Sequence, residues 1–348
     1  MHEDDPKPPS NAITAETTET IEAKVAGALV GIQIGDALAM PAHWYYDRAA
    51  LQRDYGQITD FMAPKSPHPD SILWRSKWHP PSPELDILGD QRPFWGQRGI
   101  HYHQNLEAGE STLTAKLAIE VWRSLQTCDG FDANESLQRY IDLLTHPERH
   151  GDTYLEECHR GFFTNLGRGN APAKCAIEEK HVGGLTPMLA VALYYADQAQ
   201  VGQQNALEQL ALTHAGNRMR LAAEAVLTLL FRVLHGETLE EAIRGECALQ
   251  RNPHFGFPYF KWLKKADQVV VGRHLSTACY VEGAVPSAIY LALKYSGEAE
   301  AGLIANTALG GDNVHRGSLL GALFGAECGV AGWPERWRGG LADSPIQS

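Results

Sequence analysis

The segment 306–318 carries four polar side chains directly after a Gly-Gly turn: Asp312, Asn313, His315 and Arg316. Glycine lets a ligand approach the backbone closely, and the free N–H groups at a helix start attract anions. Titratable groups crowded at such a turn are typical of binding and catalytic sites. We therefore interpret this segment as functional. The structural alternative is a tight turn in which Arg316 forms a salt bridge.

A second polar segment, residues 101–114, runs from a His-rich loop into a predicted helix start. His101 and His103 could exchange protons near neutral pH, and Glu110 with Ser111 would lie in the first helical turn, where the helix dipole acts. The structural alternative is an ordinary helix cap with a glutamate in the first turn.

A third segment, residues 27–44, has glycines four residues apart, which places them on one face of a predicted helix. Asp36 follows in an otherwise apolar run, so its carboxylate will be buried and needs a partner. His43 comes shortly after. The structural interpretation of Asp36 is a helix cap or a hydrogen-bonded core carboxylate.

Two further clusters could line a binding site. Residues 151–163 contain Asp152, Tyr154, His159 and Arg160, although a solvated helix face explains most of this pattern. Residues 254–260 are aromatic and could stack on a base, but aromatic residues in a turn also serve the core.

The elements that must position these side chains are predicted to be helices. Apolar residues recur at three- and four-residue spacing in most of the chain after residue 20. The only strand pattern is the short segment 268–272. The predicted helices span 20–33, 111–124, 133–144, 186–199, 205–212, 217–234, 239–248, 285–295, 299–309 and 318–328. We expect an all-α protein.

The domain organisation is simple. Residues 1–20 have little periodicity and are predicted to be a flexible leader, and residues 21–340 are predicted to form one domain. Residues 56–104 hold many prolines and three tryptophans without a sustained period. We predict a long ordered loop region there, because loops of such length in compact domains are usually functional or disordered.

Composition excludes several classes of protein. The 348 residues are 44% hydrophobic and carry a formal charge of -12, which argues against a generic nucleic-acid binder. Gln33 and Asp36 interrupt the most apolar stretch, so we expect no membrane span, and no secretory signal is visible. The six cysteines have no metal-finger spacing. A cytoplasmic location is expected.

The three polar segments, in this order, resemble the motifs of the ADP-ribosylglycohydrolase superfamily. That family opens with Gly-x-x-x-Gly-x-x-x-Gly-Asp-Ala, continues with Thr-Asp-Asp-Thr, and has Gly-Gly-Asp-Thr-Asp-Thr before a Gly-Ala-rich helix. The matching segments here are 27–37, 109–112 and 310–315, and the resemblance covers about residues 22–332. It implies a single-domain orthogonal helical bundle whose cleft lies where the motifs meet.

The resemblance also implies two Mg²⁺ ions, but this chain departs from the ligand pattern. The family's ligand positions fall on Gly109, Glu110 and Ser111 and on Asp312, Val314 and His315, and a further acidic position falls on His43. Because Mg²⁺ requires several hard oxygen ligands, a two-metal centre is not expected. At most one ion, held by Glu110, Ser111 and Asp312, is compatible with these residues, and binding of no metal is the alternative.

We therefore expect a hydrolase that cleaves a glycosidic bond to ribose or an ADP-ribose-like group of a small molecule or nucleotide. The predicted catalytic residues are Glu110, Asp312 and His315, and the predicted substrate-binding residues are Asp36, His43, His101, His103, Asn313 and Arg316. Arg316 would hold a phosphate or a carboxylate. One alternative is a non-catalytic member that binds a nucleotide or has a structural role. Another is an enzyme that removes a modification from Arg or Ser of a protein.

Overall fold

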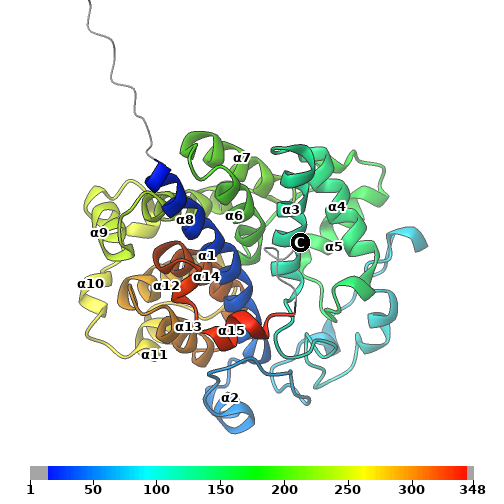
Figure 1. The fold of residues 1–348 in the computed structure, drawn as a ribbon. Helices are drawn as coiled ribbons and strands as arrows, with labels where there is room; N and C mark the ends of the chain where they lie inside the picture. Colours follow the sequence, from blue (N-terminus) through cyan, green and yellow to red (C-terminus); the bar gives the residue numbers. More distant parts are fainter. Residues whose placement is uncertain (1–14, 343–348) are drawn as a thin grey trace, which may run out of the picture.

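Two glycine-rich helices, α1 (Ala15–Ala39) and α14 (Asn313–Cys328), pack against each other at the centre of the computed structural model, which describes residues 15–342 (Figure 1). The glycines of α1 face those of α14. A Cβ atom on Gly31 would lie only 2.0 Å from the carbonyl oxygen of Gly321. The predicted glycine face is therefore the surface on which two backbones touch.

Helix α1 is longer than predicted at both ends. Residues 15–20, which we assigned to the leader, are helical, and the rest of that predicted leader lies outside the described residues. Residues 21–42 are long and apolar enough to span a membrane by length and composition, but 89% of the 18-residue apolar stretch within them is buried within the fold. This burial is typical of a core helix.

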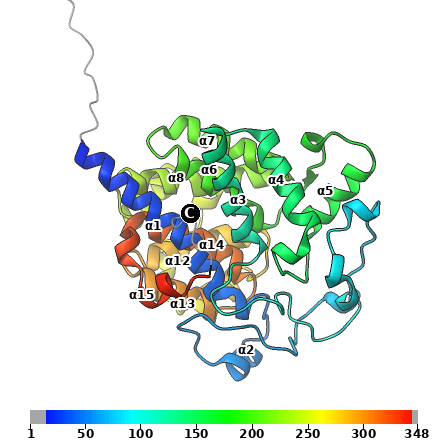
Figure 2. The ribbon, with the colours of Figure 1, turned by 45° about the vertical axis from the view of Figure 1, so that its right-hand side comes forward.

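The other helices surround this central pair (Figures 1 and 2). The predicted helices between residues 111 and 328 are all present, although several of their ends differ by several residues. On one side lie α3 (Leu113–Cys128), α4 (Ala133–Thr145), α5 (Glu157–Gly167), α6 (Leu185–Tyr194) and α7 (Ala199–Ala211). The remaining helices are α2 (Arg48–Tyr55), α8 (Asn217–Leu234), α9 (Leu239–Leu249), α10 (Tyr259–Trp262), α11 (Asp267–Val269), α12 (Val281–Lys294), α13 (Ala299–Ala308) and α15 (Glu335–Gly340).

The predicted strand at 268–272 is wrong. These residues form α11 and a distorted helical turn, Val270–His274, and the side chains of Val270 and Val271 are buried in the core. Burial explains this run of valines without a sheet. Within residues 15–342 the only paired strands are β1 (Ile177–Glu178) and β2 (His214–Ala215), which are parallel and two residues long.

The loop region 56–104 is ordered by its tryptophans and runs beside α5 (Figure 2). Apart from three short 3₁₀ helices it has no regular structure, as predicted. The indole N–H of Trp78 donates to the Thr164 hydroxyl at 3.2 Å, and that of Trp95 donates to the Thr153 carbonyl at 2.8 Å. These bonds fix the loop against α5 and the segment that precedes it.

Candidate active site

The Gly-Gly turn before α14 ties the polar start of that helix to the end of α1. Gly311, at φ +62°, donates its N–H to the Tyr45 carbonyl and accepts from the Trp44 N–H, both at 2.7 Å. A Cβ atom on Gly311 would lie 2.3 Å from the Thr277 carbonyl oxygen, so only glycine fits. The turn therefore places residues 43–45 beside Asp312, the N-cap residue of α14.

Five buried side chains form a continuous hydrogen-bonded chain behind this turn, which we call the buried relay: Asp152, His103, His43, Asp312 and His315. His103 Nδ1 contacts the Asp152 carboxylate, and His103 Nε2 lies 2.7 Å from His43 Nδ1. His43 Nε2 lies 3.0 Å from Asp312 Oδ1, and His315 Nδ1 lies 3.0 Å from Asp312 Oδ2.

Asp312 and His315 form a charged pair in the buried relay. Burial alone would raise the pKa of Asp312, but the positive charge and hydrogen bond of His315, with the hydrogen bond of His43, hold that pKa far below its usual range. Burial opposes a charge on His315, yet Asp312 and Glu156 raise its pKa to about 9. Burial lowers the pKa of His43 to about 3, so this ring is neutral. His43 then donates to Asp312 and accepts from His103.

Glu156 stands at the end of the buried relay. It is the N-cap residue of α5, and its Oε2 lies 3.7 Å from His315 Nε2. Burial raises the pKa of the Glu156 carboxyl, although the positive charges of His315 and His181 oppose the shift. Glu156 lines two cavities, one on each side of it, so its carboxyl group can be reached from a binding site.

The outer cavity has a volume of about 260 Å³, close to the lower end of the ~300–1,000 Å³ of small-molecule sites. Its rim includes the half-exposed rings of Tyr46 and Tyr280. His181 also lines it and pairs with Glu179 at 2.8 Å. Burial opposes the charge on His181, but Glu179 and Glu156 raise its pKa to about 9. Further aromatic walls come from Trp44, Tyr102 and Tyr154.

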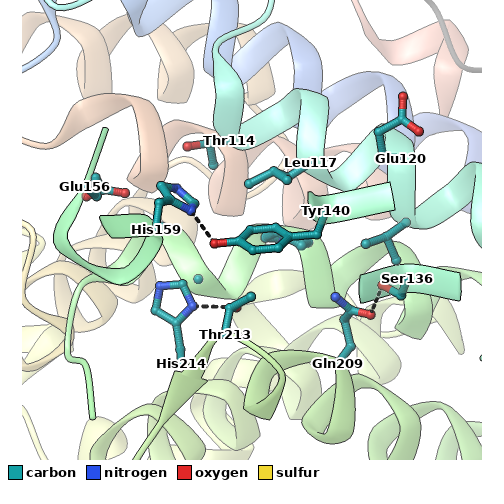
Figure 3. A pocket seen from close by; sticks show the side chains of 14 residues that line it. Thr114, Leu117, Glu120, Ser136, Tyr140, Glu156, His159, Gln209, Thr213 and His214 are labelled. Carbon is teal, nitrogen blue, oxygen red and sulfur yellow. Dashed lines mark hydrogen bonds between the residues drawn. The ribbon is translucent and has the colours of Figure 1, made fainter. Parts of the chain in front are cut away.

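The inner cavity is much smaller, and Glu156 is also among the residues that line it (Figure 3). Its volume of about 30 Å³ has room for about two water molecules, at ~10–15 Å³ each. His159 Nδ1 lies 2.8 Å from the Tyr140 hydroxyl, and His214 Nδ1 lies 2.8 Å from the Thr213 hydroxyl. Burial lowers the pKa of His159 to about 3 and that of His214 to about 4. Both rings are therefore neutral at pH 7.

The two cavities differ in what chemistry they can support. On the outer cavity, a carboxyl group with a raised pKa and an imidazolium lie on one surface that a small molecule can enter. Such a pair can accept a proton at one point of a substrate and deliver one at another. The inner cavity offers neutral, hydrogen-bonded rings and too little space for a sugar.

Comparison with known proteins agrees with this architecture. The family model described as ADP-ribosylglycohydrolase matches residues 17–347. The chain belongs to the ADP-ribosylglycohydrolase family. The predicted resemblance and the all-helical fold class are thereby confirmed.

A solved structure, named "ADP-ribosylglycohydrolase-related protein complex", has the same fold. It superposes on this chain with a TM-score of 0.64 at 18% identity. The match covers 94% of this chain and 95% of that one. No curated protein sequence matches this chain.

The magnesium ligands implied by the ADP-ribosylglycohydrolase family do not fit this site. Around Asp312 the nearest candidate donors are two imidazoles, His43 and His315, whose ligand atoms lie within 4.8 Å of one another and of the carboxylate. Mg²⁺ prefers near-octahedral sets of oxygen atoms. A second group, Glu156, Cys158 and His159, contains a thiol whose pKa burial raises well above its usual value. Neither group resembles a magnesium site.

Glu110, a predicted catalytic residue and metal ligand, points away from this cluster. Its Oε2 accepts the Glu107 N–H at 2.7 Å, which is a local turn interaction. The preceding Gly109 accepts the backbone N–H of Ala342, next to α15. Ser111 is buried, and its hydroxyl has no hydrogen-bond partner among the described residues. The structure therefore does not unite Glu110 and Ser111 with Asp312 in one metal site.

Two predicted substrate-binding residues instead hold the backbone. The Asp36 carboxylate accepts the N–H of Thr112 at 2.6 Å and its hydroxyl at 2.8 Å, which is the buried, hydrogen-bonded alternative. His101 contacts the Pro41 carbonyl through Nε2 and accepts the His103 N–H through Nδ1. His101 thus positions His103 of the buried relay, and Asp36 holds Thr112, the N-cap residue of α3.

Arg316 and Asn313 are also structural. Arg316 is fully buried, its Nε donates to Asn306 Oδ1 at 2.6 Å, and its Nη2 donates to the Gly310 carbonyl at 3.1 Å. Asn313 is fully buried and donates to the Thr307 carbonyl. Arg316 is thus committed to the Gly-Gly turn and is not exposed to a soluble phosphate.

The sequence reasoning missed Glu156 and His181. Glu156 lies inside the polar segment 151–163, but the pattern alone did not distinguish it from the exposed Glu157. His181 precedes a second Gly-Gly pair, and a Cβ atom on Gly183 would lie 3.0 Å from His315 Nε2. A polar residue close to paired glycines could therefore have indicated His181, as it did Asp312.

Proposed function

We propose that this protein hydrolyses a glycosidic bond to ribose or to an ADP-ribose-like group of a small molecule, and that Glu156 and His181 carry the reaction in the outer cavity. The observation that carries the proposal is the placement of a carboxyl group with a raised pKa and an imidazolium on one aromatic-walled cavity. Membership of the ADP-ribosylglycohydrolase family supports the type of bond.

The proposed reaction needs one base and one acid. Glu156 accepts a proton from a water molecule whose oxygen bonds to the anomeric carbon of ribose. His181 donates its proton to the leaving group as the glycosidic bond breaks. The ribosyl transition state is positively charged, so the anionic Glu156 also stabilises it electrostatically. Proton exchange with solvent restores both groups.

The buried relay has a positioning role in this proposal. Asp312 fixes His315 through Nδ1, and the resulting imidazolium lies 3.7 Å from Glu156. This positive charge favours the ionised form of Glu156 against the effect of its burial. Asp312 and His315, which we predicted as catalytic, therefore act on Glu156 and not on the substrate.

Hydrolysis of a panel of ribosyl compounds tests the proposal. The panel contains nucleosides, nucleotides, and ADP-ribosylated Arg and Ser peptides, and mass spectrometry detects the released ribose or ADP-ribose. We expect turnover of at least one compound by the purified protein and loss of that turnover in Glu156→Gln. The variant Glu148→Gln, which changes an exposed glutamate that lines neither cavity, is the matched control. Turnover that persists in Glu156→Gln would contradict the proposal.

The non-catalytic alternative is favoured by one observation. At the ligand positions implied by the family, only Asp312 places a carboxylate in the cluster with His43 and His315, because Glu110 turns to its own backbone. A nucleotide-binding protein without activity would bind members of the same panel in calorimetry and release no product from any of them.

A further inference from the structure

We propose that His43, Asp312 and His315 bind a single late first-row transition-metal ion, with Zn²⁺ as its simplest representative. This site replaces the family's pair of magnesium ions and does not depend on the proposed hydrolysis. Two imidazoles and one carboxylate are a ligand set that suits zinc, whereas magnesium selects oxygen atoms.

The spacing of the three ligand atoms supports the site. His43 Nε2 lies 3.0 Å and His315 Nδ1 lies 2.8 Å from Asp312 Oδ1, and all three ligand atoms lie within 4.8 Å of one another. A tetrahedral zinc ion with bonds of ~2.0–2.1 Å separates neighbouring ligand atoms by about 3.3 Å. The two distances to Asp312 are thus a few tenths of an ångström shorter than this value, and the two nitrogens are at most 4.8 Å apart.

The second nitrogen of each imidazole already has the environment of a metal-bound histidine. His43 Nδ1 faces His103, which contacts the Asp152 carboxylate, and His315 Nε2 faces the Glu156 carboxylate. Metal-ligating histidines almost always use their other ring nitrogen in such contacts, which fix the orientation of the ring. These contacts orient each ring so that its other nitrogen faces Asp312.

The scaffold around the ligands is closed and rigid. The three side chains are at most 3% exposed, and they come from the turn after α1 and from the start of α14, which the Gly-Gly turn holds together. An ion here would bind both segments and stabilise the folded state. Binding replaces the two N–H contacts to Asp312 by two nitrogen–metal bonds. The Nδ1 proton of His315 and the Nε2 proton of His43 leave to solvent, and His43 Nδ1 takes the proton that His103 Nε2 donates to it, so both ligands are neutral imidazoles. The ion then supplies the positive charge beside Glu156 that the His315 imidazolium carries without it.

Metal content and affinity test this site directly. The protein is purified without a nickel column, its bound metals are quantified by mass spectrometry, and the EDTA-treated protein is titrated with Zn²⁺, Co²⁺ and Mg²⁺. We expect about one equivalent of a transition metal per chain, a visible absorption band from Co²⁺ in a histidine-containing site, and a rise of the melting temperature with Zn²⁺ but not with Mg²⁺.

Variants distinguish this site from adventitious binding. His43→Gln and His315→Gln should each lose the Co²⁺ band and at least tenfold in Zn²⁺ affinity, whereas His146→Gln, which changes a half-exposed surface histidine, should keep both. His103→Gln leaves the three ligands in place and should weaken affinity by ~10–100-fold. Circular dichroism checks the fold of each variant. Wild-type protein that binds no Zn²⁺ or Co²⁺, or binding that all folded ligand variants retain, would overturn the proposal.

Discussion

The two cavities that share Glu156 contain histidines in opposite states. In the inner cavity, burial lowers the pKa of His159 to about 3 and that of His214 to about 4, and both rings bond to neutral hydroxyl groups. In the outer cavity, Glu179 and Glu156 together outweigh burial and raise the pKa of His181 to about 9. The comparison shows that the presence of a histidine does not identify a catalytic group. A catalytic histidine is identified by a charged partner and by a cavity that the substrate can enter.

The strongest test of this difference concerns the shared residue. Glu156→Gln removes the base from the outer cavity but keeps the size of the side chain. We expect kcat to fall by ~10²–10⁴-fold, the usual contribution of a general base. Steady-state kinetics on the best substrate of the panel measures the fall. An equal loss in Glu148→Gln would show that the effect is not specific to the shared position.

The second test compares one histidine substitution in each of the two cavities. His181→Gln removes the proposed acid, and we expect kcat to fall by ~10²-fold. His214→Gln changes a neutral ring of the inner cavity, so its kcat should stay within about threefold of the wild type. If folded His214→Gln lost more of its kcat than His181→Gln, the reaction would take place in the inner cavity and not in the outer one.

The third test separates stability from activity in the inner cavity. Tyr140→Phe deletes the hydroxyl that contacts His159 at 2.8 Å. It leaves a buried polar ring atom without a partner, which costs ~1–3 kcal/mol. Urea denaturation should show this loss of unfolding free energy while kcat/KM is unchanged. A large loss of kcat/KM with unchanged stability would instead assign the inner cavity a role in catalysis.

The smallest expected effect is the pH dependence of the stability that the pair of Glu179 and His181 contributes beside the outer cavity. The folded-state pKa of His181 is raised from 6.5 to about 9 and that of Glu179 is lowered from 4.5 to about 2. The pair therefore contributes fully to stability between about pH 4.5 and 6.5, and its contribution declines as the pH rises through about 9.

His181→Gln should accordingly lower the unfolding free energy by on the order of 1 kcal/mol near pH 6. The difference from the wild type should vanish above about pH 9. Urea denaturation at the two pH values measures both quantities. A difference that grows with pH would mean that His181 is neutral in the folded protein.

The fold could be predicted because its determinants are periodic. The glycines at 27, 31 and 35 defined a face, and the structure places that face against the glycines of α14. Apolar spacing located α8 at the predicted residues. The prediction was wrong at the valines 269–271 because β-branched residues suit a buried turn as well as a strand. Within residues 15–342 no strand lies beside them.

Only part of the site could be predicted, since a periodic sequence pattern does not show in which direction a polar side chain points. The segments that carry His43, His103, Asp312 and His315 were identified, and the structure brings these four residues together. Glu110 and Arg316 carry the expected charges, but local hydrogen bonds turn them to the backbone. Glu156 and His181 are defined by the cavity that they share, and a cavity is formed by residues distant in the chain.

The most direct measurement is a crystal structure of the protein with ADP-ribose bound. We expect the ribose to occupy the outer cavity, with Glu156 and His181 within hydrogen-bond distance of the anomeric hydroxyl group. Ribose bound beside Glu110, or an outer cavity that remains empty while the ligand binds elsewhere, would contradict it.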